Sequence, residues 1–299
     1  MTFRITLLST LFLFVSTSSY ALGKLGHQLT CDLTYQQLTS ATKAKLDHLL
    51  SAVDKRSLVE LNQYNYRKKL APMSFANACT WPDMIKNLPK YQQYKKWHYI
   101  NINRGQSSIS EESCRKNCIT QAIPFHQQQL MSLSNSKEKL EAVMFLSHWV
   151  ADIHQPLHVS YANDLGGNKT KVKSHDGKCT NMHWLWDQCL LSRQIDTKDH
   201  KMRYQYLFTT LQSQLKKSKE SKQIESWQQS TVIDWANESL KLTISEGLSY
   251  CRMHHGNCQR INQQPLVLAD NYQTVYSKKL NMRIVQASVR LAHLLEQSL

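Results

Sequence analysis

The chain has 299 residues, with 37 Lys and Arg against 22 Asp and Glu, and a formal net charge of +15 at pH 7. This basic excess attracts polyanions such as nucleic acid or an anionic membrane surface, but it does not identify the partner by itself. With 8 Gly and 6 Pro, the chain has few turn-forming residues, which disfavours a many-stranded sheet. We find no repeat and no linker, and therefore expect one α-helical domain over residues 22–299.

The first 21 residues are typical of a secretory signal peptide. Arg4 supplies the positive charge at the start, and the apolar run at 5–15 is too short to span a bilayer. Small residues precede the expected cleavage after Ala21; an uncleaved membrane anchor is the alternative interpretation. Since we find no other apolar run of spanning length, we expect a secreted protein, periplasmic or extracellular, with no stable membrane association.

All eight cysteines lie beyond this segment. An even number of cysteines in an exported protein indicates disulfides, and local spacing suggests a set of four. The pairs are Cys114–Cys118, Cys179–Cys189 and Cys251–Cys258, which leaves Cys31–Cys79. A cysteine-ligated zinc is the alternative, but the sequence has no CxxC motif to favour it.

After cleavage the chain would begin at Leu22, five residues before His27. If this terminus is buried, its α-amine and the Leu22 carbonyl can chelate a metal that His27 also reaches. A frayed terminus with a surface histidine is the alternative. Two amphipathic helices are expected next, over 28–38 and 40–51, with Thr39 or Ser40 as the cap of the second.

Two further candidates are weak when each is taken alone. Asp83 directly follows Pro82, at a place where a helix can begin and where an acidic residue is favourable for its charge. The segment 97–101 reads as extended, so that His98 and Tyr99 would face opposite sides. A histidine among aromatic residues is usually a core residue.

The strongest helical pattern covers 137–155, with Asn135 or Ser136 as its cap. His148 and Asp152 are four residues apart, so they share one face and form a candidate metal-ligand pair. The helix would bury a stripe made of Leu140, Val143, Met144, Ser147 and Ala151.

Pro156 ends that helix, and the bend brings His158 towards the same place from a new direction. His154 falls on another face and is expected to have a structural role. Residues 161–179 are polar and contain Gly166–Gly167, which indicates a loop over the site. A new helix then carries His183 and Asp187, a second pair at the same spacing.

The C-terminal third shows helical patterns near 199–217, 230–248 and 272–298. Val285, Val289 and Leu295 belong to an apolar ladder that indicates packing. The run 216–219 is expected to be a solvated face, and we find no titratable cluster in this third that suggests chemistry.

Together these stretches resemble the zinc-dependent, single-strand-specific nuclease/3′-nucleotidase family of fungi and plants, the mung bean nuclease type, which also has bacterial members. The most specific part is the run DIHQPLH at 152–158, followed by GGN at 166–168 and HxxxD at 183–187. Supporting matches are GxxGH at 23–27, WxD at 81–83, WHYIN at 97–101 and VRLA at 289–292.

The resemblance implies a mainly α-helical fold with three zinc ions at the bottom of a cleft, similar to zinc-dependent phospholipase C. The first zinc would be held by Asp83, His98, His148 and Asp152. The second would be held by His158, His183 and Asp187. The third would be held by the amine and carbonyl of Leu22, by His27 and by Asp152, which would bridge two ions. Nitrogen and oxygen donors without cysteine suit zinc in a catalytic site.

The resemblance also implies that Asp83, Asp152 and Lys86 act in catalysis and that Tyr99, Asn101 and Asn168 bind substrate. Lys86 stands where the family has an arginine near the scissile phosphate, and keeps the charge without the planar bidentate contact. Tyr99 lies where the family stacks a base on an aromatic ring, which requires an unpaired base. Asn101 replaces an aspartate of some members, and Leu22 replaces a tryptophan.

The expected function is that of a secreted, monomeric endonuclease and 3′-nucleotidase. It would act on single-stranded DNA and RNA and on 3′-nucleotides, and leave 5′-phosphate products. The main alternative is a zinc-dependent phospholipase C, although that type usually has glutamate where this chain has Asp187. A non-catalytic, zinc-stabilised basic binding protein is the third possibility.

Overall fold

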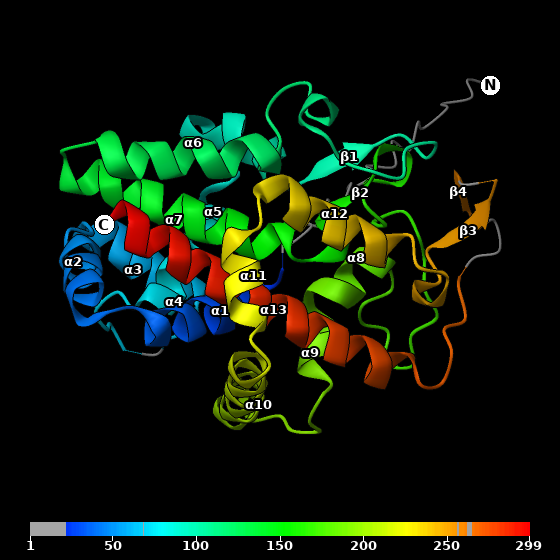
Figure 1. Ribbon diagram of the computed structural model, residues 1–299. Coiled ribbons are helices and arrows are strands. Elements are labelled where there is room, and N and C mark those ends of the chain that lie inside the picture. Colours follow the sequence, from blue (N-terminus) through cyan, green and yellow to red (C-terminus); the bar gives the residue numbers. More distant parts are fainter. Residues whose placement is uncertain (1–21, 68, 256, 262–264) are drawn as a thin grey trace, which may run out of the picture.

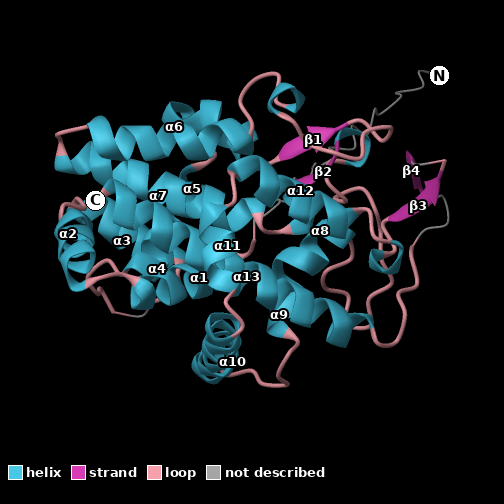
Figure 2. Cartoon of the chain, in the orientation of Figure 1, coloured by secondary structure: helices cyan, strands magenta, loops and turns pink. Residues whose placement is uncertain are grey.

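The computed structural model describes residues 22–67, 69–255, 257–261 and 265–299, so the expected signal segment lies outside the described residues. Helices dominate the described chain, and the short strands lie towards one side of the molecule (Figures 1 and 2). The prediction of a mainly α-helical fold is confirmed. The buried apolar side chains form one connected core.

The α-helices, in chain order, have the following bounds: α1 (Lys24–Gln37), α2 (Ser40–Ser51), α3 (Lys55–Tyr64), α4 (Phe75–Ala78), α5 (Trp81–Ile85), α6 (Ile119–Ser132), α7 (Ser136–Ile153), α8 (Met182–Trp184), α9 (Leu190–Ser192), α10 (His200–Glu220), α11 (Gln223–Gln229), α12 (Val232–Thr243) and α13 (Tyr272–Ser298). Short 3₁₀ helices are η1 (Pro89–His98), η2 (Glu111–Ser113), η3 (Pro156–His158), η4 (Ala162–Asp164) and η6 (Glu246–Leu248), and η5 (Leu185–Cys189) is a π-helical turn.

Helix α7 forms the centre of the core. It packs against α1, α2, α5, α6 and α13, and every side chain from Ala142 to Ile153 is buried. The expected stripe is buried as predicted, but the burial extends around the whole C-terminal half because helices cover α7 on several sides. His148 and Asp152 therefore lie inside the protein rather than at the edge of an apolar face.

Both ends of α7 follow from the sequence. The Asn135 side chain accepts hydrogen bonds from the backbone N–H groups of Lys137 and Glu138, at 2.9 and 3.2 Å. Such a cap satisfies N–H groups that have no partner within the helix. At the other end the chain leaves α7 at Ile153 and Pro156 opens η3, which carries His158.

Helix α1 begins at Lys24, four residues before the predicted start, and places His27 in its first turn. The Leu22 side chain is buried and covers Gly26, where an added Cβ would lie 2.6 Å from Leu22 Cγ. Only glycine therefore fits below Leu22 without a rearrangement. Helix α2 has the predicted bounds, and Thr39 caps it by accepting from the Thr42 N–H.

The predicted extended segment at 97–101 is wrong in its first half. The 3₁₀ helix η1 runs to His98, and the strand β1 begins only at Ile100 (Ile100–Ile102). β1 pairs in parallel with β2 (Val159–Tyr161), with Ile100 opposite Val159. This register places His98 and His158, which precede the two strands, at the same end of the pair.

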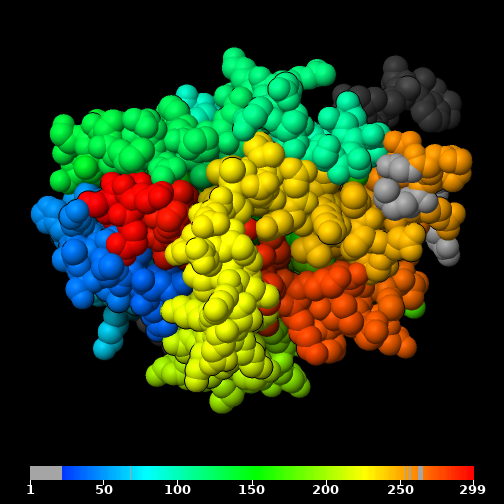
Figure 3. Space-filling view, in the orientation of Figure 1, coloured from blue at the N-terminus to red at the C-terminus, as the bar shows by residue number. Residues whose placement is uncertain are grey.

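The C-terminal predictions agree with α10, α12 and α13 to within a few residues, except that α12 ends at Thr243 rather than 248. In Figure 3 the yellow segments of α10 to α12 lie across α13, whose red and orange parts remain visible on either side. In the run 216–219 the three lysines are exposed, as expected, but Ser218 is buried. Sequence patterns did not indicate α3, α6 or α11.

The four expected disulfides are confirmed: Cys31–Cys79, Cys114–Cys118, Cys179–Cys189 and Cys251–Cys258. The last one closes an antiparallel hairpin of β3 (Cys251–His254) and β4 (Asn257–Arg260). Such bonds fit a chain that folds in an oxidising compartment. Within the described part of the chain, no helix is both long enough and apolar enough to span a membrane.

Candidate metal centre

Five histidines and three aspartates from six separate segments meet in the interior. All eight side chains are at least nine-tenths buried. They come from α1 (His27), α5 (Asp83), the end of η1 (His98), α7 (His148 and Asp152), η3 (His158) and the α8–η5 segment (His183 and Asp187). The structure thus brings together every side chain that the resemblance assigns to metal binding.

Asp152 is the central carboxylate of this group. Its Oδ2 atom lies 3.0 Å from His98 Nδ1 and 3.2 Å from His148 Nε2. Its Oδ1 atom lies 3.2 Å from His27 Nε2, on the other side. One carboxylate therefore faces histidines in two directions, which is the arrangement that a bridging ligand needs.

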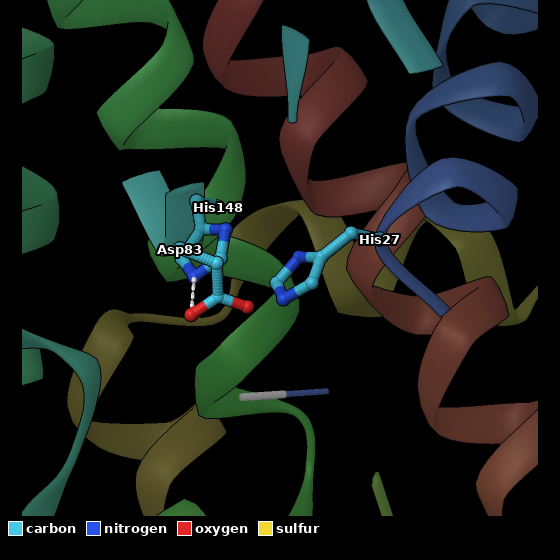
Figure 4. A group of neighbouring side chains, drawn as sticks. All are labelled: His27, Asp83 and His148. Atoms are coloured by element: carbon cyan, nitrogen blue, oxygen red, sulfur yellow. Dashed lines mark ion pairs between the residues drawn. The ribbon is translucent and has the colours of Figure 1, made fainter. Parts of the chain in front are cut away.

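The candidate ligands form three groups, and within each group the donor atoms lie within 4.8 Å of one another. His158, His183 and Asp187 are one group, as the resemblance implies for the second zinc. The other groups are His98–His148–Asp152 and His27–Asp83–His148. Figure 4 shows the His27 ring directed towards Asp83 and His148, which lie together opposite it. His27 thus lies near Asp83 and His148, which the resemblance assigns to the first zinc, as well as near Asp152.

The donor atoms fit a bound cation. Five buried atoms make no hydrogen bond within the described protein: both ring nitrogens of His27, Asp152 Oδ1, His158 Nε2 and Asp187 Oδ2. Buried polar atoms without a partner are costly, and a metal ion coordinated by them removes that cost. Imidazole and carboxylate donors without thiolate suit zinc, and all eight cysteines are in disulfides.

Backbone carbonyls orient three of the imidazoles. The Nδ1 atom of His148 lies 2.7 Å from the Cys79 carbonyl oxygen, and that of His158 lies 2.6 Å from the His98 carbonyl. The Nδ1 atom of His183 lies 2.7 Å from the Gly166 carbonyl. When Nδ1 carries the proton in each contact, Nε2 is left as the ligand atom, which is the usual outer contact of a metal-bound histidine.

The cluster keeps the carboxylates of Asp83 and Asp152 ionised. Burial alone would raise the pKa of Asp83, but the charges of Lys86 and the neighbouring histidines lower it to about 2. For Asp152, burial is likewise outweighed by His148 and His158, and the pKa lies well below its usual range. Both groups are therefore anionic at neutral pH, as metal ligands must be.

The Gly166–Gly167 turn is fixed by Asp164, a buried residue that sequence reasoning missed. Its carboxylate accepts hydrogen bonds from the Gly167 N–H at 3.1 Å and from Arg104 at 2.8 Å. Thr170 donates to the same carboxylate at 3.0 Å and Tyr250 at 2.5 Å. We call this group the Asp164 network; it joins the loop after β2 to β1 and to the β3–β4 hairpin.

Gly166 can take its place only as glycine. Its φ is +63°, and an added Cβ would lie 2.7 Å from the Leu157 carbonyl. The turn aims the Gly166 carbonyl at His183, so the Asp164 network acts on a candidate ligand through the backbone.

A second polar network, with buried arginines and a half-exposed carboxylate, lies behind α7. Glu238 on α12 accepts hydrogen bonds from Arg283 and Arg290 on α13, and Arg290 Nη1 lies 2.8 Å from His154 Nε2. His154 Nδ1 contacts the Val150 carbonyl, so both its nitrogens are engaged away from the metal centre. Sequence patterns found no cluster in this third; two arginines seven residues apart on an apolar helix were the available signal.

Lys86 and the candidate substrate residues have different surroundings. Lys86 Nζ is 3.0 Å from Asp83 Oδ1. Tyr99 and Asn101 line a cavity of about 360 Å³, and Asn101 Oδ1 is buried without a hydrogen bond in the described protein. The Asn168 amide donates to the Leu165 carbonyl at 2.8 Å, so part of its side chain holds its own turn.

Two other features were outside the predictions. Gln155 Nε2 donates to Asp187 Oδ1 at 2.6 Å, and thereby links the DIHQPLH run to the second HxxxD ligand pair. At the N-terminal end of the described chain, the Gly23 N–H donates to the Asp187 carbonyl at 2.9 Å. Leu22 is therefore held close to a candidate ligand.

Comparison with known proteins agrees with this geometry. The family model described as S1/P1 Nuclease matches residues 22–299. Endonuclease 3 of Arabidopsis thaliana is 31% identical over 243 residues, 75% of this chain and 78% of that protein. Endonuclease 5 of the same plant is 30% identical over 245 residues, 75% and 79% of the two chains. Nuclease S1 of Aspergillus oryzae is 29% identical over 174 residues, which cover 56% of this chain and 54% of that protein. The fold, the buried histidine–aspartate cluster and a match over the whole described chain show that this protein belongs to the S1/P1 nuclease family.

Proposed function

We propose that this protein is an exported zinc-dependent endonuclease and 3′-nucleotidase. It hydrolyses phosphodiester bonds of single-stranded DNA and RNA, and the 3′-phosphate of nucleotides, and it leaves 5′-phosphate products. The observation that carries the proposal is the position of Asp152, a buried carboxylate between histidines on both sides, in a chain of a nuclease family. The four disulfides support the proposed export.

Three zinc ions are proposed, held by the ligand sets that the resemblance implies. The first set is Asp83, His98, His148 and Asp152, the second is His158, His183 and Asp187, and the third is Leu22, His27 and Asp152. Once bound, zinc supplies Lewis acidity and a water-derived nucleophile near neutral pH. The third set needs the free α-amine of Leu22, and so depends on cleavage after Ala21.

The side chains around the cluster would hold the substrate. Lys86, anchored 3.0 Å from Asp83, places a positive charge at the cluster where a phosphate oxygen would lie. Tyr99, which directly follows the candidate ligand His98 in the chain, and Asn101 line a cavity that an unpaired base could enter. Stacking of a base on Tyr99 would require that base to be unpaired, which supports single-strand preference. Asn168 would contact the substrate from the turn above His183.

The test compares four substrates with one preparation of mature protein: a single-stranded oligonucleotide, the same sequence as a duplex, 3′-AMP and phosphatidylcholine vesicles. We expect cleavage of the single strand to oligonucleotides with 5′-phosphates, release of phosphate from 3′-AMP, and little action on the duplex. Turnover of phosphatidylcholine alone would contradict the proposal and favour the phospholipase alternative. Elemental analysis of the same preparation gives the zinc count, for which we expect three per chain.

A further inference from the structure

The segment between β2 and α8 can be followed in Figure 1. Within it, three exposed lysines follow the Gly166–Asn168 turn. Lys169, Lys171 and Lys173 are exposed, while Thr170 and Val172 between them are buried, at 3% and 4% exposure. Over 170–173 this alternation is the pattern of an extended strand with one face on the core, so Lys171 and Lys173 point to the same side. Lys169 is exposed at the end of the preceding turn, and we call the three lysines together the lysine row.

Backbone hydrogen bonds fix this extended segment on both sides. On one side it pairs with 180–182, and on the other side with Leu266. The bonds are Val172 N to Thr180 O at 3.0 Å, Met182 N to Thr170 O at 2.9 Å, Lys173 N to Leu266 O at 2.8 Å and Leu266 N to Lys171 O at 2.9 Å. The lysine row is thus built on an ordered backbone rather than on a free loop.

The lysine row begins at the edge of the metal centre. Lys169 follows Asn168 directly, and its N–H donates to the Asp164 carbonyl at 3.0 Å, within the segment that carries the Asp164 network. The partner strand continues from Met182 into His183, a candidate ligand. A chain that leaves the metal centre past Asn168 therefore meets the three lysines in order.

Spacing and charge fit a phosphate backbone. Alternate residues of a strand are about 6.8 Å apart, which is comparable to the distance between neighbouring phosphates of an extended single strand. The Arg260 guanidinium donates to the Lys169 carbonyl at 3.1 Å and adds to the positive charge. Asp176, the acidic residue of this loop, is 2.7 Å from Arg193. Its charge is thereby compensated away from the lysine row.

We propose that the lysine row binds the sugar–phosphate backbone of single-stranded nucleic acid outside the scissile position. This deepens the proposed function and rests on it. Lysines hold phosphates as point charges without reading bases, so this surface would favour long strands over mononucleotides, independently of sequence. It would give the enzyme a preference for substrate length.

The test uses two triple variants of the zinc-loaded mature protein. Lys169, Lys171 and Lys173 are changed to glutamine in one, and Lys216, Lys217 and Lys219 on α10 in the other. The second is the matched control, since its lysines are also exposed and the change in net charge is the same. KM is measured for a long single-stranded oligonucleotide and for 3′-AMP, at several salt concentrations.

We expect the ratio of oligonucleotide KM to 3′-AMP KM to rise about tenfold in the lysine-row variant and to remain near the wild-type value in the control. Each phosphate contact contributes about 0.7 to the dependence of log affinity on log salt for single strands, so the slope should fall by about 2 in the lysine-row variant alone.

Equal ratios in the two variants, with an active wild-type enzyme, would overturn the lysine row and leave the proposed function standing. A wild-type protein that cleaves no nucleic acid would overturn the proposed function, and this proposal with it. If the lysine-row variant keeps its ratio but no longer binds phosphatidylserine vesicles, the surface belongs to a membrane contact and the proposal is also overturned.

Discussion

At the scale of single residues, Asp152 has the most demanding position in the molecule. It is fully buried, and four histidines have a ring nitrogen within 3.7 Å of its carboxylate oxygens. A buried anion in this setting is stabilised only while positive charge lies beside it. The same carboxylate is proposed as a ligand of two zinc ions, so a change at this position affects two sites.

Asp152→Asn tests this role with almost no change in shape. We expect the variant to fold, to hold fewer zinc ions, and to lose activity by a larger factor than the 10–100-fold typical of outer contacts of a metal site, since a direct ligand is removed. Elemental analysis and the rate on single-stranded DNA measure the two effects. Asp176→Asn, at an exposed aspartate on the surface, is the control. Full zinc content in Asp152→Asn would contradict the bridging role.

At the scale of elements, the Asp164 network joins three pieces of chain that carry parts of the site. Arg104 follows β1, Tyr250 precedes β3, and Asp164 itself opens the turn that leads to Gly166. This turn places the Gly166 carbonyl against His183 Nδ1. Asp164 is therefore a positioning residue, because it acts on the ligand through the backbone.

Asp164→Asn should loosen this turn. The amide can keep some of the hydrogen bonds but leaves Arg104 without its charge partner, and we expect zinc affinity to fall about 10–100-fold, as for other outer contacts of metal sites. Tyr250→Phe removes a single hydrogen bond from the same carboxylate and should have a smaller effect. Zinc titration of metal-depleted protein measures both. If raised zinc does not restore the activity of Asp164→Asn, the residue does more than position a ligand.

Glu238 makes the packing of α12 on α13 dependent on pH. Burial alone would raise the pKa of Glu238, but hydrogen bonds and charge from Arg290 and Arg283 lower it below the usual 4.5. A lowered carboxyl pKa means that the ion pair stabilises the fold above pH 4.5, and that this contribution is lost as pH falls through the lowered value.

Glu238→Gln should therefore destabilise the protein at neutral pH. We expect a loss of about 1–3 kcal/mol in the free energy of unfolding, less than for a fully buried pair because the Glu238 side chain is 35% exposed. Urea unfolding at pH 7 and in steps below pH 5 measures the difference, which should shrink as the wild type is protonated. A difference that is constant with pH would show that charge is not the cause.

At the scale of the whole molecule, the sequence predicts elements far better than it predicts contacts between them. Caps predict the starts of α2 and α7, and the 3.6-residue period predicts the extent of α13; both are local properties. The candidate ligands were identified from the motif at 152–158 and from the resemblance of the chain to the nuclease family. The partners of Asp164 could not be inferred, because Arg104 and Tyr250 are 60 and 86 residues away.

The Cys31–Cys79 disulfide links two parts of the N-terminal region that are distant in sequence. It joins α1 to the turn before α5, across a sequence separation of 48 residues. The Cys79 carbonyl also accepts the contact from His148 Nδ1 at 2.7 Å. The disulfide therefore fixes, through one backbone position, the fold of this region and the orientation of a candidate ligand.

Replacing Cys31 and Cys79 together by serine should lower the free energy of unfolding by about 4 kcal/mol, from the entropy of the loop that is no longer closed. The zinc held by the set with His148 should be lost more easily than that held by His158, His183 and Asp187. Calorimetry and stepwise chelation measure these effects. Removal of Cys114–Cys118, which closes a much shorter loop, is the comparison. If the two disulfide variants release the zinc of the His148 set equally easily, the proposed link between Cys31–Cys79 and His148 is contradicted.

This disulfide has a consequence for the cell that makes the protein. On the proposed function, a newly made chain in a reducing cytoplasm would carry Cys31 and Cys79 as thiols, and a leader not yet removed would mask the α-amine of Leu22. The third proposed zinc site would then lack its amine ligand, and the contact that orients His148 in the first would be less constrained. With oxidation and leader removal both following export, the nuclease activity would arise only outside the compartment that holds the cell's own RNA.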